Sequence, residues 1–509
     1  MDILFNITKI GVTTVYISCL TILCIFGLNR FYLIYLNNRN RRIINLPEPG
    51  TFRLPRVTVQ LPIYNEYYVI RRLINSVSNI DYPRELLEIQ VLDDSTDNTA
   101  IIAKDLVEKH RSQGININYL HREERLGFKA GALENGLKHS TGELVAIFDA
   151  DFVPPRNFLL KTVPYFSNEK VGIVQTRWEH LNRYYSSLTK AQSILLDGHF
   201  AVEQQARYQG DYFLNFNGTA GLIRKQSIIN SGGWQHDTLT EDLDLSYRIQ
   251  LGGWKIVYLD EVTVDSELPV DINSFKSQQH RWAKGGTQTA LKLLPGILRN
   301  KKLSKGLKIE CGLHLLANFS YPLLLMLILL MIPMAYMWQS LGWQKVILIS
   351  LLAVTTGTLS VFNFYYSAIR KTMGTKWRDL AVYIPLSIAL GSALMINNTR
   401  AVLEALINKN TEFKRTPKFA ITNKRLNSKS VRYKSSYEFI FILELIFGFL
   451  FLLKTLYALY TGYYGWIPFL IIIQLGFFYS SVLSLMHSRS IHIPMRHINI
   501  YKFLILRPK

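Results

Sequence analysis

The chain has 509 residues, enough for two or three domains, and 49% of them are hydrophobic. Its 58 Lys and Arg residues outnumber its 37 Asp and Glu residues, which gives a net charge of +21. The basic residues crowd next to long apolar segments and no known nucleic-acid-binding motif is present. We therefore expect the basic residues of this chain to face a lipid bilayer and not a nucleic acid. Three cysteines are too few to indicate a disulfide framework.

The first apolar segment, residues 11–36, is long enough to span a bilayer and has no cleavage site after a short core. Only Lys9 precedes it, whereas three arginines lie within residues 39–42. The positive-inside rule then places the N-terminus outside and the following domain in the cytoplasm. Four later segments are also long enough to span, at 315–338, 346–367, 437–459 and 466–486. The sequence thus predicts an integral, multi-pass membrane protein with five crossings and a soluble domain in the cytoplasm.

A shorter apolar segment, residues 381–396, contains Pro385 and Gly391. Basic residues precede it, and residues 400–434 hold ten Lys or Arg against two Glu. Both flanks are therefore expected in the cytoplasm, which favours an interfacial or re-entrant helix over a sixth crossing. On this interpretation residues 398–435 form a cytoplasmic basic loop.

The chain divides by composition into three parts: residues 1–46, an N-terminal helix with a basic flank; 47–300, a soluble domain; and 301–509, membrane or interfacial helices. In the middle part, strand-like and helix-like segments alternate, which predicts an α/β domain with a mainly parallel sheet. The expected strands are 57–61, 87–92, 115–120, 144–148, 171–176 and 256–259. The expected helices are 66–79, 98–110 and 128–139, with another beginning near residue 240.

Two acids follow the strand predicted at residues 144–148. This apolar run is typical of a strand buried on both faces, and it ends in Asp149-Ala-Asp151. Ligands of parallel sheets bind beyond the carboxyl ends of strands. If the chain stays extended, both carboxylates point the same way and can hold Mg²⁺ or Mn²⁺, which in turn holds phosphates. The alternative is a polar turn after a core strand.

Other polar strings follow strands or open helices. Tyr64 and Glu66 follow the first strand and can clamp a planar base, although an ordinary loop is as good an interpretation. Asp94 follows the second strand, where a capping turn is the alternative. Lys129 opens a helix at Gly127-Phe-Lys-Ala-Gly131 and can reach a phosphate, unless it is simply a solvated lysine.

Two further strings suit a transfer reaction. Thr240 is a good helix N-cap and the acids of Glu241-Asp242 suit the positive end of the helix dipole. Asp242 can also act as a general base that the helix end keeps ionised. In Gln278-Gln-His-Arg-Trp282, Arg281 offers planar donors for a diphosphate and Trp282 a flat face for a sugar. The alternative for this string is a basic and an aromatic residue at a membrane interface.

Taken in order, these strings resemble the family 2 glycosyltransferases, specifically the processive, membrane-embedded polysaccharide synthases. Asn215-Phe-Asn-Gly-Thr-Ala-Gly221, Glu267-Leu-Pro269 and the string ending in Trp282 look like the cellulose-synthase-like A group of mannan and glucomannan synthases. The resemblance implies a Rossmann-like GT-A domain with a mainly parallel sheet, plus a helical transmembrane bundle. A related group makes β-1,4-glucan, and this sequence does not separate the two.

The resemblance also implies residue roles. The catalytic residues would be Asp242, Glu241 and Asp149, and the metal ligands Asp149 and Asp151. The donor nucleotide sugar would contact Tyr64, Glu66, Asp94, Lys129, Asp149, Gln278 and Arg281. The acceptor would contact Trp282, Asn217, Gly218 and Thr219. A gating loop would include Phe413, Thr416 and Lys418, although Arg415 stands where the family pattern has valine.

The implied reaction is inverting transfer from GDP-mannose to a growing β-1,4-linked polysaccharide, assisted by a divalent cation and followed by export. Alternatives are a β-glucan synthase that uses UDP-glucose and an enzyme that glycosylates a lipid once. Outside enzymes, the chain would be a transporter or scaffold with a degenerate nucleotide-sugar domain, against which the full set of acids weighs.

Overall fold

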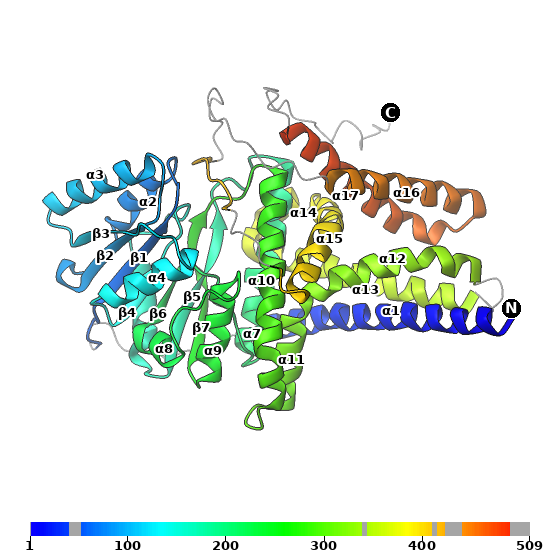
Figure 1. Cartoon of the computed structure of the whole chain (residues 1–509), viewed down its shortest axis with the longest axis horizontal. Helices are drawn as coiled ribbons and strands as arrows, with labels where there is room; N and C mark the ends of the chain where they lie inside the picture. Colours follow the sequence, from blue (N-terminus) through cyan, green and yellow to red (C-terminus); the bar gives the residue numbers. More distant parts are fainter. Residues whose placement is uncertain (1, 40–51, 338–343, 410–414, 423–439, 489–509) are drawn as a thin grey trace.

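The computed structural model describes residues 2–39, 52–337, 344–409, 415–422 and 440–488, and the description below covers these residues (Figure 1). A mixed α/β domain lies at one end of the molecule and a group of long helices at the other. Helix α10, Ile272–Arg299, stands between the two parts. The N-terminus lies at the end of the long helices that is farthest from the α/β domain.

The domain is built on one seven-stranded sheet with the order β3-β2-β1-β4-β6-β5-β7. Its strands are β1 Val57–Ile63, β2 Leu87–Asp93, β3 Ile117–His121, β4 Leu144–Ile147, β5 Val171–His180, β6 Gly221–Arg224 and β7 Lys255–Ser266. Strand β6 is antiparallel to both of its neighbours, and the other pairings are parallel. The carboxyl ends of β1, β2 and β4 therefore meet at one edge, where a ligand site is expected.

Helices pack on both faces of this sheet, as in a doubly wound fold. Those that follow the first strands are α2 Ile70–Val77, α3 Thr99–Ser112, α4 Phe128–His139 and α5 Phe158–Thr162. Those that follow later are α6 Ser187–Asp197, η3 Gly198–Gln204, α7 Gln205–Gln209, α8 Lys225–Asn230 and α9 Glu241–Leu251.

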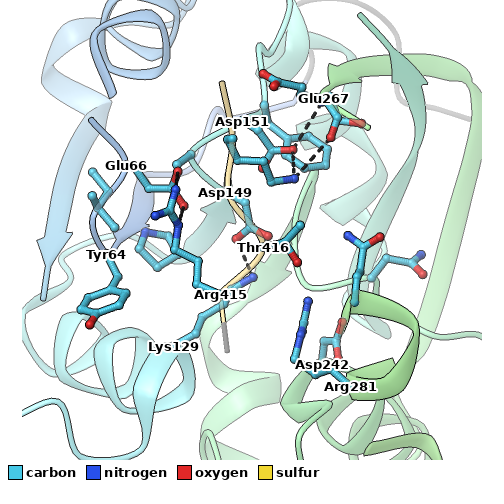
Figure 2. Close-up of a pocket in the computed structure, with 18 of the residues that line it drawn as sticks. Tyr64, Glu66, Lys129, Asp149, Asp151, Asp242, Glu267, Arg281, Arg415 and Thr416 are labelled. Carbon is cyan, nitrogen blue, oxygen red and sulfur yellow. Dashed lines mark hydrogen bonds and ion pairs between the residues drawn. The ribbon is translucent and has the colours of Figure 1, made fainter. Parts of the chain in front are cut away.

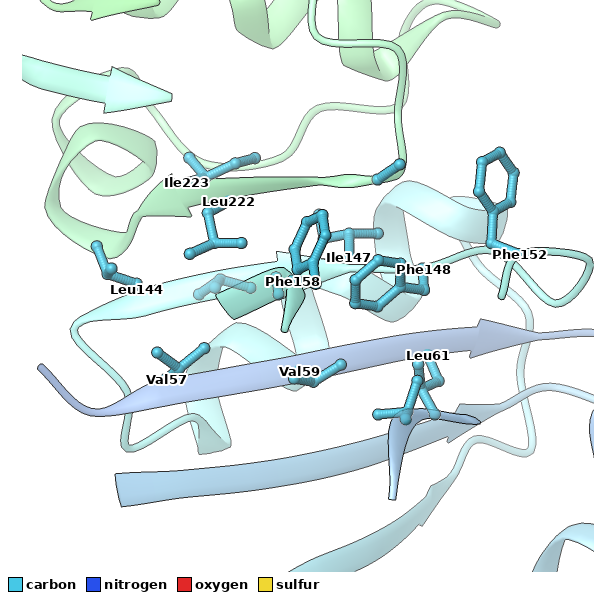
Figure 3. Close-up of a cluster of buried hydrophobic side chains, with 14 of the residues drawn as sticks. Val57, Val59, Leu61, Leu144, Ile147, Phe148, Phe152, Phe158, Leu222 and Ile223 are labelled. Carbon is cyan, nitrogen blue, oxygen red and sulfur yellow. The ribbon is translucent and has the colours of Figure 1, made fainter. Parts of the chain in front are cut away.

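The core of the domain explains why β4 is so apolar. Val145, Ile147 and Phe148 are fully buried in the main hydrophobic core, where β1 and β6 flank β4 on its two edges (Figure 3). The ring of Phe148 packs edge-on against Phe158, with 5.0 Å between ring centroids. Burial of this kind stabilises a fold by about 25 cal/mol per Å² of apolar surface. The strand that precedes the two acids is thus held rigidly.

The predicted strands and the first three helices are present, with ends shifted by a few residues. Strand β5 continues to His180, and β7 has twelve residues where four were predicted, because partly exposed polar residues interrupt its apolar pattern. The elements that were not predicted include the four-residue strand β6, the helical run 187–209 and the helices α5, α8 and α10.

Five helices form the apolar end: α1 Asp2–Asn38, α12 Ser320–Met337, α13 Gln344–Met373, α16 Ile440–Thr461 and α17 Ile467–Ser488. By length and composition, four stretches of the described chain are able to cross a membrane, at Thr8–Asn38, Leu348–Ala381, Ile440–Thr461 and Tyr464–His487. A fifth is the pair Lys305–Leu315 and Ala317–Met331, bent by 49°. The five predicted spans agree with these segments, and their orientation in a bilayer stays a prediction.

The predicted interfacial segment belongs to α15, Ile384–Leu406, which follows α14, Trp377–Ala381. Helix α15 is not among the stretches able to cross a membrane, and it lies against α10. The amide of Asn397 donates to the Lys276 carbonyl at 3.0 Å, which joins the two helices. Whether α15 lies at a membrane surface stays a prediction. The prediction of a basic loop over 398–435 was wrong at its start, because residues 398–406 belong to α15; the rest is described only at 407–409 and 415–422.

A buried ion pair joins the α/β domain's last helix to the apolar helices. The Lys276 ammonium lies 2.7 Å from the carboxylate of Glu444 on α16 and donates to the hydroxyl of Ser484 on α17, also at 2.7 Å. Both members of the pair are less than one-tenth exposed. Because an unpaired buried charge is costly, this contact fixes how α10 meets α16 and α17.

Candidate active site

One pocket lies where the carboxyl ends of β1, β2 and β4 meet the start of α9, the middle of α10 and residues 415–418 (Figure 2). It gathers most of the residues that the sequence singled out: Tyr64, Glu66, Asp94, Lys129, Asp149, Asp151, Asn217, Glu241, Asp242, Gln278, Arg281, Trp282, Thr416 and Lys418. The first and last of these are 354 positions apart along the chain. The fold therefore brings together groups suited to bind a nucleotide, a diphosphate and a sugar.

The two acids of the D-x-D string both line this pocket, but not by the strand alternation that we expected. Strand β4 ends at Ile147, and the chain then turns so that the Phe152 N–H donates to the Asp149 carbonyl at 3.0 Å. The two carboxylates contact different cations: Asp149 lies 2.5 Å from the Lys129 ammonium, and Asp151 lies 2.7 Å from that of Lys418.

The donor set at Asp149 and Asp151 suits a hard divalent cation. Within the described residues, no three His, Cys, Asp or Glu side chains are grouped so that they hold a metal by themselves. Two carboxylates satisfy part of the octahedral shell that Mg²⁺ requires, and phosphate oxygens and water ordinarily complete it. The residues thus fit a cation that binds together with a diphosphate.

Lys129 is the cation at the centre of the pocket. Its ammonium donates to the Gly218 carbonyl at 2.9 Å as well as contacting Asp149. Burial alone would lower the pKa of Lys129, but the charges of Asp149 and Glu241 outweigh burial and raise it. The side chain is therefore positively charged at any physiological pH, as a diphosphate-binding group should be.

Asp242 lies at the start of α9, and its Oδ1 accepts the N–H of Leu243 at 2.9 Å. Burial and the nearby Glu241 raise the pKa of Asp242 to about 7. The prediction that the helix end keeps this acid ionised was therefore wrong in direction, because burial outweighs the helix terminus. Thr240 does not cap the helix with its hydroxyl, which instead lies 3.3 Å from the hydroxyl of Thr289.

Two arginines that the sequence analysis missed lie beside Tyr64 and Asp94. The guanidinium of Arg125 stacks on the Tyr64 ring, with 3.4 Å from Cζ to the ring centroid. Arg122 donates to both carboxylate oxygens of Asp94, at 2.8 and 2.5 Å. Both arginines lie in the loop between β3 and α4, so the rule that ligands bind beyond strand ends could have located them.

Residues 415–422 cover the pocket from the side of Glu66. Arg415 donates to both carboxylate oxygens of Glu66, at 2.7 and 2.8 Å, and burial nevertheless raises the pKa of Glu66 to about 7. The N–H of Phe419 donates to the Glu267 carboxylate at 2.8 Å. The departure from valine at position 415 thus adds a charged contact. Of the predicted gating loop, Thr416 and Lys418 lie here and Phe413 lies outside the described residues.

The predicted acceptor residues separate into two groups. Asn217 lines the pocket, as Trp282 does, but Gly218 and Thr219 do not. Thr219 is fully buried, and its hydroxyl accepts the Asp149 N–H at 2.9 Å, so it supports the D-x-D turn and cannot reach a sugar. Gly218 has φ +77°, and a Cβ there would lie 2.9 Å from Asp242 Oδ2. Glycine is therefore required for the close approach, and the expected acceptor contacts of these two residues are corrected.

A doubly wound mixed sheet with two acids at its carboxyl edge and a half-buried acid at the start of α9 is the arrangement expected of the GT-A class of glycosyltransferases. Residues 55–285 match the family described as glycosyltransferase-like family 2. This match covers somewhat less than half of the chain, and over those residues it agrees with the resemblance seen in the sequence.

Relatives of this chain include plant enzymes. Over 281 residues the chain is 43% identical to glucomannan 4-beta-mannosyltransferase 1 of Oryza sativa subsp. japonica. The aligned region covers 54% of this chain and 53% of that protein. Over 264 residues it is 44% identical to glucomannan 4-beta-mannosyltransferase 2 of Arabidopsis thaliana. That alignment covers 50% of this chain and 49% of the relative. The chain thus spans about half the length of these relatives.

Among solved structures, the fold is similar to that of a mannosyltransferase from Pyrobaculum calidifontis, determined in complex with GDP-Man and Mn²⁺. The TM-score is 0.55 at 20% sequence identity, over 79% of this chain and 99% of that one. This likeness confirms the predicted GT-A fold.

Proposed function

We propose that this chain is a membrane-embedded, inverting hexosyltransferase that extends a β-1,4-linked mannan or glucomannan with mannose from GDP-mannose. The relatives named above support the sugar and the linkage. The observation that carries the proposal is the position of Asp242, which lines the same pocket as the Lys129–Asp149 pair and Trp282.

In this proposal Asp242 is the general base. It takes the proton from an acceptor hydroxyl, and that hydroxyl attacks the anomeric carbon of the donor. A pKa of about 7 suits this task, because the base is partly ionised near neutral pH and still holds the proton it accepts. Attack from the face opposite the leaving group inverts the anomeric centre, so an α-linked donor gives a β-linked product.

The leaving diphosphate gains negative charge as its bond to the sugar breaks. Lys129 and Arg281 line the pocket and stabilise that charge electrostatically. Asp149 and Asp151 would hold Mg²⁺ or Mn²⁺, which when bound supplies further charge stabilisation on the diphosphate oxygens. Tyr64, Glu66 and Asp94 would then surround the base, with Gln278 on the donor side and Trp282 stacking on the acceptor sugar.

The proposal also places the protein in the bilayer as a multi-pass protein with its pocket on the cytoplasmic side. The apolar helices are long enough to cross, and basic residues follow the first of them. The polymer would leave the cell along these helices.

The decisive experiment compares donors with the full chain in inverted membrane vesicles that contain Mg²⁺ or Mn²⁺. Labelled GDP-mannose is expected to give a long polymer that a β-mannan-specific hydrolase degrades, and Asp242→Asn is the matched inactive control. Polymer from UDP-glucose alone would identify a β-glucan synthase, and a single lipid-linked sugar would identify a lipid glycosyltransferase. Product from neither donor would leave a transporter or scaffold and overturn the proposal.

A further inference from the structure

The helical run 187–209 contains a wide turn next to the pocket. Between α6 and α7 the segment η3, Gly198–Gln204, is π-helical. Turns of this kind are rare and occur frequently at functional sites. Leu196, two residues before the wide turn, lines the pocket. The turn therefore lies against the site, and its side chains have to be considered as parts of it.

His199 connects this turn to the pocket wall. Its Nε2 lies 2.9 Å from the side-chain oxygen of Asn217, and its Nδ1 lies 3.2 Å from a carboxylate oxygen of Glu203. The same oxygen of Asn217 also accepts from the amide of Asn215 at 2.9 Å. A carboxylate and an amide oxygen are both acceptors, so both contacts are satisfied when each ring nitrogen of His199 carries its hydrogen.

Glu203 is itself fixed by charge. Arg207 donates to its other carboxylate oxygen at 3.1 Å, and Arg207 also lies 2.9 Å from Glu310. Burial alone would raise the pKa of Glu203, but the hydrogen bond from His199 and the charge of Arg207 lower it below its ordinary range. The carboxylate therefore stays charged and holds the imidazole ring in one orientation.

The far end of this chain of contacts is next to the general base. Asn217 lines the pocket, and its neighbour Gly218 is packed against the Asp242 carboxylate. The amide nitrogen of Asn217 donates to the Asn215 carbonyl at 3.4 Å, which is long for a hydrogen bond. A sugar hydroxyl can replace that weak partner, whereas the amide oxygen is held by two donors.

We propose that His199 and Glu203 are positioning residues that orient the Asn217 amide toward the acceptor sugar. The inference rests on the proposed function, because it assigns Asn217 to the acceptor side of a transferase. Asn217 then donates to an acceptor hydroxyl and helps to hold the attacking hydroxyl near Asp242. Neither His199 nor Glu203 touches the reacting atoms.

Three substitutions of His199 separate positioning from folding. Glutamine has an amide N–H as many bonds from Cα as Nε2 of histidine, so it can replace the contact to Asn217. Asparagine has its amide N–H only as far from Cα as Nδ1 of histidine. Alanine has neither group. With the full chain in vesicles, GDP-mannose as donor and β-1,4-mannotetraose as acceptor, we expect the KM for the acceptor to rise about tenfold in His199→Asn and His199→Ala. It should rise much less in His199→Gln. The KM for the donor, and GDP release without acceptor, should stay close to the wild-type values.

A double-mutant cycle keeps the test valid if single variants lose stability. In an Asn217→Ser background, His199→Asn should cause no further rise in the acceptor KM, because the group that His199 orients is gone. His139→Gln, an exposed histidine remote from the pocket, is the matched control. Equal effects of Gln, Asn and Ala, or additive effects in the cycle, would overturn the inference. A wild-type chain without transferase activity would instead overturn the proposed function.

Discussion

The ammonium nitrogen of Lys418 lies 2.7 Å from Oδ2 of Asp151, so a lysine from the covering segment neutralises one of the two acids at the end of β4. Lys418 also donates to the Glu267 carbonyl at 3.3 Å. A divalent cation and this ammonium require the same carboxylate. If Asp151 holds the cation as proposed, the covering segment and the cation compete for this carboxylate.

Replacement of Lys418 should strengthen cation binding in the absence of donor. In Lys418→Met the cation no longer has to displace a charged hydrogen bond, which predicts about tenfold tighter Mn²⁺ binding. Titration of the purified protein with Mn²⁺, followed by electron paramagnetic resonance, measures this directly. Lys409→Met is the control, because Lys409 is mostly exposed and lies 4.0 Å from its acidic neighbour Glu404. Equal affinities in all three proteins would contradict the competition.

Removal of the Arg415 side chain should loosen the cover over the pocket. Arg415→Val restores the residue of the family pattern and removes both hydrogen bonds to Glu66. Trypsin cleavage after Lys418, followed by mass spectrometry, should then become at least about tenfold faster, because local opening costs less free energy. Arg400→Val removes a more exposed arginine that pairs with Glu404 and should leave this cleavage unchanged. Unchanged cleavage in Arg415→Val would show that the ion pair does not hold the segment.

The proposed base predicts the acid limb of the pH profile. Burial and Glu241 raise the pKa of Asp242 to about 7, so the carboxyl is protonated and unable to accept a proton below that pH. The kcat/KM, which reports the pKa of the free enzyme, should fall about tenfold per pH unit on the acid side and level off above neutrality. Glu66→Gln should keep this limb, although the pKa of Glu66 is also raised to about 7. If the acid limb disappears in Glu66→Gln, the titrating group is Glu66 and not Asp242, which would contradict the prediction.

The Lys276–Glu444 pair predicts a specific stability pattern. Glu444→Ala leaves a buried ammonium without its counter-ion, which should destabilise the protein by about 3–5 kcal/mol. The thermal midpoint in detergent should fall clearly in this variant and recover in Lys276→Met combined with Glu444→Leu. Arg156→Ala, which removes an exposed ion pair with Asp81, should change the midpoint little. A similar fall of the thermal midpoint in Glu444→Ala and in Arg156→Ala would argue against a special role of the buried pair.

The parts of the fold that were predictable are those in which one physical requirement dominates. Strand β4 is buried on both faces, so its sequence is a pure apolar run, and the long apolar helices are equally simple to recognise. Strand β6 has only four residues, Gly221–Arg224, and shows no alternation. The π-helical turn was also missed, because periodicity of 3.6 residues does not reveal a local wide turn.

The site was predictable wherever acids follow strands or open helices, as Asp149, Asp151 and Asp242 do. It was not predictable where a role depends on the path of the chain. Thr219 faces the D-x-D turn and not the pocket, and Arg125 has the sequence context of a solvated loop residue. The pKa of Asp242 depends on burial, which no local pattern reveals.

Gly198 begins the wide turn that carries His199, and it also faces the apolar helices. A Cβ at this position would lie 2.6 Å from the ring of Phe364 and 3.1 Å from that of Tyr365, so α13 packs directly onto the backbone of the turn. Lys371 of α13 also donates to the Ala201 carbonyl of the turn at 2.9 Å, which joins the two elements further. A tilt of α13, such as a thinner or thicker bilayer would impose on a membrane-spanning helix, is therefore expected to reach the proposed acceptor site.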